Sequence, residues 1–118
     1  MIRNRKDKSV EVRENMRGGR GRILIAHLWR NDEMNAGCCR MAAEITIPPG
    51  NSIGFHRHEE EEEIFYIVSG IADFDDDGRV VRLGPGDTTL TSAGSGHAIA
   101  NAGKDDLVIM AVINRFHS

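Results

Sequence analysis

The chain has 118 residues and carries 15 Lys and Arg against 18 Asp and Glu, which gives a formal net charge of −3 at pH 7. This length can bury one hydrophobic core, so we expect one small domain. A net acidic chain with 5% aromatic residues lacks both the basic surface and the stacking residues that a nucleic-acid-binding protein needs. No apolar run approaches the ~18 residues that span a bilayer, and we expect neither nucleic acid nor a membrane as a partner.

The first 22 residues differ from the rest in their charge, because Lys and Arg outnumber Asp and Glu there. A nucleic-acid arm is one interpretation, but the acidic balance of the whole chain favours a solvated segment. We therefore expect residues 1–22 to form an N-terminal arm or edge strand that packs on the main domain or on a partner subunit, and residues 23–118 to form that domain. The segment lacks the apolar stretch of a signal peptide, so we expect a cytoplasmic protein.

Short strand-forming runs follow one another through the rest of the chain, and glycine, proline or polar residues end each of them. The expected strands are 22–29, 38–47, 64–68, 71–74, 79–83, 88–91, 97–101 and 107–113. Residues 31–37 are expected to form a loop with at most one helical turn, and Asp77-Gly78 between two extended runs predicts a hairpin. Many short strands without a sustained helical period favour an all-β barrel or sandwich.

Two neighbouring cysteines, Cys38 and Cys39, fall on one of these expected strands. Successive side chains of a strand point to opposite faces, so the pair suits neither a structural disulfide nor a thiolate metal site. We expect reduced thiols.

Four side chains in the second half of the chain could form a metal site. His56 and His58 are two residues apart and project to the same side of an extended segment. Glu63 lies at the start of the 64–68 strand, after an acidic turn, and His97 opens a later strand. Three imidazoles and one carboxylate suit a single divalent transition metal.

Each of these residues also has a simpler interpretation. A His-x-His pair arises by chance in many sequences, and the acidic run 59–63 is expected to be a solvated loop in which only Glu63 turns inward. His27 and His117 are expected to lie outside any site, as surface or core residues.

The spacing of these residues resembles that of the cupins, a family of single-domain metal-binding barrels. The first cupin motif, G-x5-H-x-H-x(3,4)-E-x6-G, is matched by Gly50, His56, His58, Glu63 and Gly70. The second motif, G-x5-P-x-G-x2-H-x3-N, is matched by Gly86, Gly94, His97 and Asn101. Ser92 stands where the second motif has proline, which leaves that loop freer but removes no ligand.

The resemblance implies a cupin-type double-stranded β-helix, which is a small jelly-roll barrel. It implies that His56, His58, Glu63 and His97 bind one divalent metal, which could be Mn, Fe, Ni, Co, Cu or Zn. It also implies a homodimer. Strand alternation places Phe65 and Ile67 beside Glu63, and Ile99 beside His97, so the interior near the metal is expected to be mainly apolar.

Three functions remain open from the sequence. The first is a metal-dependent enzyme on a small chelating organic molecule, dioxygenase-like or decarboxylase/lyase-like. The others are a non-catalytic cupin that binds or senses a small ligand, and a sugar-phosphate isomerase or epimerase. No catalytic acid or base stands out beside the metal ligands, so no catalytic residue is assigned.

Overall fold

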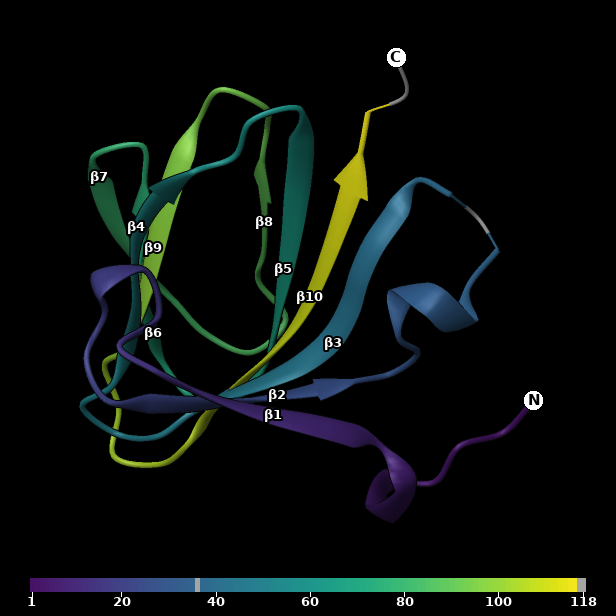
Figure 1. Cartoon of the computed structure of the whole chain (residues 1–118). Coiled ribbons are helices and arrows are strands. Elements are labelled where there is room, and N and C mark those ends of the chain that lie inside the picture. Colours follow the sequence, from purple (N-terminus) through teal and green to yellow (C-terminus); the bar gives the residue numbers. More distant parts are fainter. Residues whose placement is uncertain (36, 117–118) are drawn as a thin grey trace.

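The computed structural model describes residues 1–35 and 37–116, and within them it consists of ten antiparallel strands and three single-turn 3-10 helices (Figure 1). The helical turns are η1 (Arg5–Asp7), η2 (Met16–Gly18) and η3 (Asn31–Glu33). The strands are β1 (Ser9–Glu14), β2 (Arg22–His27), β3 (Cys39–Ile47), β4 (Ser52–Arg57), β5 (Glu61–Ser69), β6 (Ala72–Asp76), β7 (Arg79–Leu83), β8 (Thr88–Thr91), β9 (Gly96–Asn101) and β10 (Leu107–Arg115).

The strands form two sheets that face each other and enclose the interior. The larger sheet has the order β1-β2-β3-β10-β5-β8, and the smaller one has the order β4-β9-β6-β7. Figure 1 shows the smaller sheet on the left, opposite β5 and β10. Because the chain alternates between the two sheets, the fold is the jelly-roll barrel that the sequence predicted.

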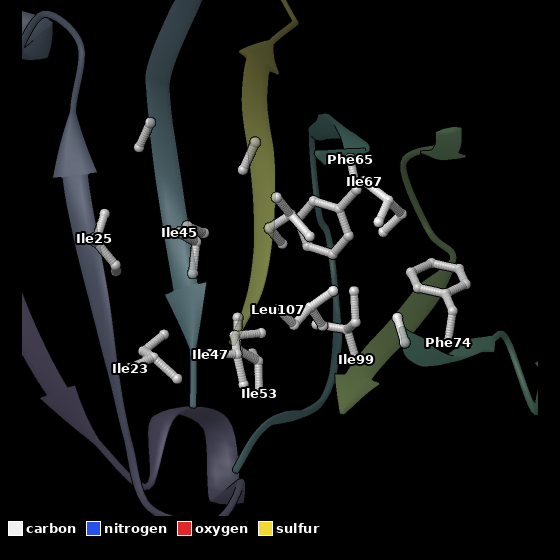
Figure 2. Close-up of a cluster of buried hydrophobic side chains, with 14 residues drawn as sticks. Ile23, Ile25, Ile45, Ile47, Ile53, Phe65, Ile67, Phe74, Ile99 and Leu107 are labelled. Atoms are coloured by element: carbon white, nitrogen blue, oxygen red, sulfur yellow. The ribbon is translucent and has the colours of Figure 1, made fainter. Parts of the chain in front are cut away.

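Isoleucine is the most frequent buried residue of the interior. Along the strands that form it, buried and more exposed residues alternate, as β10 illustrates. On this strand Leu107, Ile109, Ala111 and Ile113 are buried, and the residues between them are not. Figure 2 shows isoleucines from both sheets along the interior, with Phe65 and Phe74 at one end of the cluster. Burying each large aliphatic side chain contributes about 1.5–3 kcal/mol, which makes this cluster the main source of stability.

The expected turns are present. Asp77 and Gly78 connect β6 to β7 with φ of 50° and 102°, the positive values that a tight hairpin needs, and η3 is the single helical turn expected in 31–37. Most strand boundaries lie within two residues of the expected ones, and one differs by three. The strand expected at 64–68 begins at Glu61, three residues earlier, so part of the acidic run is strand and not loop.

Two strands, β1 and β4, had no bounds of their own in the expected series, although residues 1–22 were expected as an arm or edge strand and His56 and His58 were placed on an extended segment. In β1 the run Ser9–Glu14 pairs antiparallel with β2 and forms the edge of the larger sheet. Its alternation of valine with charged residues has no continuous apolar run, which is why it was expected only as an arm or edge strand.

Candidate metal centre

Four side chains from both sheets meet in the interior of the barrel. They are His56, His58, Glu63 and His97, called here the His–Glu cluster. Strand β4 carries His56, and His58 follows its end, while Glu63 lies on β5 and His97 on β9. The β4–β9 register places His56 opposite His97. The structure therefore brings together all four residues that the sequence singled out.

The ligand atoms of the His–Glu cluster lie within 4.8 Å of one another. Nε2 of His58 is 2.8 Å from Oε1 of Glu63 and 3.1 Å from Nε2 of His97, which is 3.0 Å from the same carboxylate oxygen. Two ligand atoms that are each about 2.1 Å from one metal ion, at right angles, are about 3.0 Å apart. These distances match the edges of such a coordination shell, so the four residues could hold one metal ion.

The outer nitrogen of each imidazole has a partner that fixes the orientation of the ring. Nδ1 of His56 donates to the carbonyl oxygen of Gly54 at 2.8 Å. Nδ1 of His97 is 2.8 Å from the hydroxyl of Thr91. A carbonyl oxygen only accepts hydrogen bonds, so the proton of His56 is on Nδ1 and Nε2 presents its lone pair.

The third imidazole is supported by charged residues. Nδ1 of His58 donates to Oε1 of Glu61 at 3.0 Å, and Arg40 binds both oxygens of Glu61, with distances of 2.8 and 2.9 Å. The expectation that only Glu63 of the acidic run turns inward was wrong. Because β5 already includes Glu61, strand alternation places its side chain on the same face as Glu63.

Burial differs across the His–Glu cluster and changes its protonation. His58, Glu63 and His97 are 3%, 4% and 1% exposed, whereas His56 is only partly buried. Burial lowers the pKa of His56, and the charges of His97, His58 and, least of all, Arg17 lower it further. The hydrogen bond to Glu63 raises the pKa of His58. Burial alone would raise the pKa of Glu63, but hydrogen bonds from His58 and His97 hold it below its ordinary value.

Aromatic rings close one side of the His–Glu cluster. The ring of Phe65 stacks on His97, with centroids 4.8 Å apart and an interplanar angle of 15°, and Phe74 meets His97 edge-on at 5.7 Å. Phe65, Ile67 and Ile99 are all buried, as strand alternation predicted. These contacts restrict the His97 ring and keep water away from that side.

A cavity of about 80 Å³ lies on the other side, next to His56, His58 and Glu63. Its wall is apolar at residues such as Ile53 and Phe65. Charged side chains complete the wall, namely Glu11, Arg13, Arg17 and Arg40. The interior was expected to be mainly apolar near the metal, and the structure adds this charged rim, largely from the N-terminal segment.

The other histidines and the cysteines stand apart from the His–Glu cluster. His27 pairs with Glu11 at 2.9 Å, and His117 lies outside the described residues. Cys38 and Cys39 are free cysteines. In the described ranges, 1–35 and 37–116, no helix is long and apolar enough to cross a membrane.

The sequence did not identify Thr91, Glu61 or Arg40 as partners of the ligands. For Glu61 alone the sequence offered a signal, since side chains alternate along β5 and Glu61 is therefore on the same face as Glu63. Thr91 and Arg40 come from other strands, and strand register brings them to the site.

Comparisons with known proteins agree with this geometry. A family model described as a cupin domain matches residues 43–113. The oxalate-binding protein of Thermotoga maritima is 43% identical over 99 residues, which cover 84% of this chain and 81% of that protein. A crystal structure described as a predicted oxalate decarboxylase from Thermotoga maritima matches with a TM-score of 0.92 and 39% identity, covering 98% of this chain and 100% of that one. The Cnp3 cupin domain of Schizosaccharomyces pombe, 15% identical, shares the fold with a TM-score of 0.73 over 92% of this chain and 70% of its own.

Proposed function

The chain belongs to the cupin family, and from that premise we propose that its His–Glu cluster holds one divalent transition metal that binds a small chelating dicarboxylate. Oxalate is the smallest such ligand. The observation that carries the proposal is the convergence of three Nε2 atoms and one carboxylate oxygen next to a cavity of about 80 Å³. The name of the Thermotoga maritima oxalate-binding protein supports the choice of ligand.

The size of the cavity restricts the ligand. A water molecule takes about 30 Å³ in the liquid, so the cavity of about 80 Å³ has room for a few waters or for one molecule of a few heavy atoms. Pockets for drug-sized ligands begin at about 300 Å³. This comparison favours a two-carbon or three-carbon acid and disfavours a sugar phosphate.

The chain's own residues would prepare this site before the ligand arrives. Gly54, Glu61 and Thr91 fix the three imidazoles through their Nδ1 atoms, and Phe65 keeps His97 from turning. A bound metal would supply a Lewis-acidic centre with positions open to a chelating ligand. The cavity lies next to these positions, so a chelating ligand in it would replace water on the metal.

A metal-dependent enzyme, dioxygenase-like or decarboxylase-like, is the second candidate. The partly buried position of His56 beside the cavity favours it, because a reacting molecule could reach that side of the cluster. A decarboxylase must also deliver a proton to its product. The two carboxylates nearest the site other than Glu63 already accept hydrogen bonds from cations, Glu11 from Arg13 and Glu61 from Arg40, so we favour binding as the main function.

Metal analysis and calorimetry on untagged protein test the proposal. We expect about one equivalent of a transition metal in the parent and none in the double variant His56→Ala/His97→Ala. Oxalate should bind the metal-loaded parent, and acetate, which has a single carboxylate, should not. Oxalate that disappears with release of formate or CO₂ would favour the enzyme. A parent without metal after reconstitution would contradict the proposal.

We also propose that two copies of the chain associate through the outer face of the larger sheet. Apolar residues cover this face on four of its strands: Val10, Val12, Ile64, Tyr66, Val68, Leu90, Val108, Met110 and Val112. The strand registers place Met110 beside Tyr66, and Val112 beside Ile64. Six strands of up to nine residues make a face of about 25 by 30 Å, close to the ~800 Å² that each partner gives to a stable interface.

The mass in solution tests this association. Light scattering should give twice the chain mass of 13.0 kDa for the parent, and the single chain mass for Met110→Glu, because a carboxylate in the centre of the interface would be buried without a partner. Val80→Glu is the control, since Val80 is exposed on the smaller sheet. A parent that runs as a single chain would contradict the proposed dimer.

A further inference from the structure

One segment of the charged rim comes from the connection between β1 and β2. We call residues 15–21 the strap, which includes η2 and crosses from the larger sheet to β4 of the smaller one. Its ends are tied by the Asn15 amide, which donates to the Gly21 carbonyl at 2.9 Å. The Ser52 amide of β4 donates to the Arg20 carbonyl, also at 2.9 Å. The strap therefore has a fixed place on β4.

The fit between the strap and β4 is close enough to require glycine on both sides. A Cβ atom at Gly54 would overlap the carbonyl oxygen of Arg17, and one at Gly19 would overlap the carbonyl oxygen of Ser52. Gly54 is also the residue whose carbonyl orients His56. The position of the strap is thus coupled to the exposed side of the His–Glu cluster.

The strap also holds two non-glycine residues in the left-handed region, Asn15 with φ of 50° and Arg17 with φ of 54°. This conformation costs energy for residues with a Cβ atom, and the surrounding contacts must maintain it. With the backbone in this conformation, Met16 and Arg17 both line the cavity.

Arg17 differs from the two other arginines of the cavity wall. Arg13 pairs with Glu11 and Arg40 pairs with Glu61. Arg17 has no ion-pair partner within residues 1–35 and 37–116. Its planar guanidinium is suited to bind a carboxylate through two parallel hydrogen bonds.

The net charge of the metal-loaded site indicates a role for Arg17 in ligand binding. One carboxylate and three neutral imidazoles carry a single negative charge, and a divalent metal turns it into a single positive one. A dicarboxylate dianion would leave the site with a single negative charge beside apolar residues such as Ile53 and Phe65. An uncompensated charge in such surroundings is costly, and one arginine removes it.

We propose that Arg17 is the specificity residue that selects dianionic ligands over monoanionic ones, with the strap holding it over the cavity. This inference rests on the proposed function, because it needs a ligand bound at the His–Glu cluster. The inference assigns to Arg17 the recognition of the second negative charge of the ligand, a task that the metal ligands do not perform.

The test compares two chelating acids on metal-loaded protein, oxalate as the dianion and glycolate as the monoanion. Arg17→Gln should weaken oxalate binding about tenfold, as expected for the loss of one charge-assisted contact, and should change glycolate binding much less. Arg20→Gln is the matched control, since Arg20 is on the same strap but does not line this cavity. Metal content, measured on every variant, should stay at the parent value.

A second variant tests the strap itself. Gly54→Ala should displace the strap and reduce the preference for oxalate as Arg17→Gln does. Equal losses of oxalate and glycolate in Arg17→Gln, or no loss of either, would overturn the role of Arg17 while leaving the proposed function in place. A parent that carries metal and binds neither acid would overturn the proposed function, and this inference with it.

Discussion

His58 and His56 are two residues apart in the same His–Glu cluster, yet the molecule supports them differently. His58 is 3% exposed, and the charged pair of Glu61 and Arg40 fixes its ring. His56 is only partly buried, and a backbone carbonyl, that of Gly54, fixes its ring. The buried side of the cluster is therefore supported by side chains of β3, β5, β8 and β9. The exposed side depends on Gly54, which contacts the strap.

This difference suggests a division of tasks. The buried side, with His58, Glu63 and His97, is at most 4% exposed, and partners that orient the ligands, as they do here, raise metal affinity. The more exposed side, with His56 and Arg17, lies towards the charged rim of the cavity, where a ligand would exchange with water. Substitutions on the two sides should consequently affect different quantities, namely metal affinity on the buried side and ligand affinity on the exposed side.

The largest expected effect follows from removing a buried ligand. His58→Ala should weaken metal binding by more than about 100-fold, since even partners one shell further out are worth 10–100-fold. His56→Ala should weaken it less, because His56 is the most exposed member of the cluster and water can take its place. Competition with a chromophoric chelator measures both. His27→Ala, a histidine outside the cluster, serves as the control, and equal losses for His56 and His58 would refute the division.

Glu61 provides the next test, because it touches no metal position itself. Glu61→Ala should weaken metal binding by about 10–100-fold, since His58 loses the partner that orients its ring. Glu61→Gln should lose less, because its amide oxygen still accepts from Nδ1. Glu62→Ala is the matched control on the other face of β5, and the same chelator competition applies. An unchanged affinity in Glu61→Ala would mean that burial alone orients His58.

Thr91 should show a smaller effect on the same buried side. Thr91→Val keeps the shape of the side chain and removes the hydroxyl that contacts Nδ1 of His97. A neutral hydrogen bond contributes about 1 kcal/mol, so metal affinity should fall about fivefold. The ring of Phe65 still restricts His97, which limits the loss. If Thr91→Val lost as much metal affinity as Glu61→Ala, a neutral partner would orient its histidine as strongly as a charged one does.

The residues of the His–Glu cluster could be predicted because the information is local. His56, His58 and Glu63 lie within one short segment, and the alternation of strand faces predicts which side chains meet. The same alternation predicted the buried positions of Phe65, Ile67 and Ile99. It failed at Glu61 because the strand was expected to begin at the first apolar residue, and five consecutive glutamates hid the true start of β5.

The partners of the cluster could not be predicted because they depend on how distant strands pair. Arg40 is on β3 and Glu61 is on β5, and both strands are neighbours of β10. The strap is a similar case. Its fit on β4 depends on Gly19 and Gly54, which are 35 residues apart, and no sequence pattern links these two glycines.

The smallest expected effect lies outside both sides of the cluster, at the ion pair of Arg3 and Glu33. The hydrogen bond from Arg3 lowers the pKa of Glu33 to about 2, with a further contribution from the Arg30 amide. A carboxyl group with a lowered pKa in the folded state stabilises it above the ordinary value, 4.5, and loses this contribution as pH falls towards 2. The difference in melting temperature between the metal-free parent and Glu33→Gln should therefore be constant above pH 5 and shrink between pH 4.5 and 2. Metal affinity at neutral pH should be the same in both proteins, because the pair contacts no residue of the cluster; a weaker affinity in Glu33→Gln would show that the support of the metal site extends to the N-terminal segment.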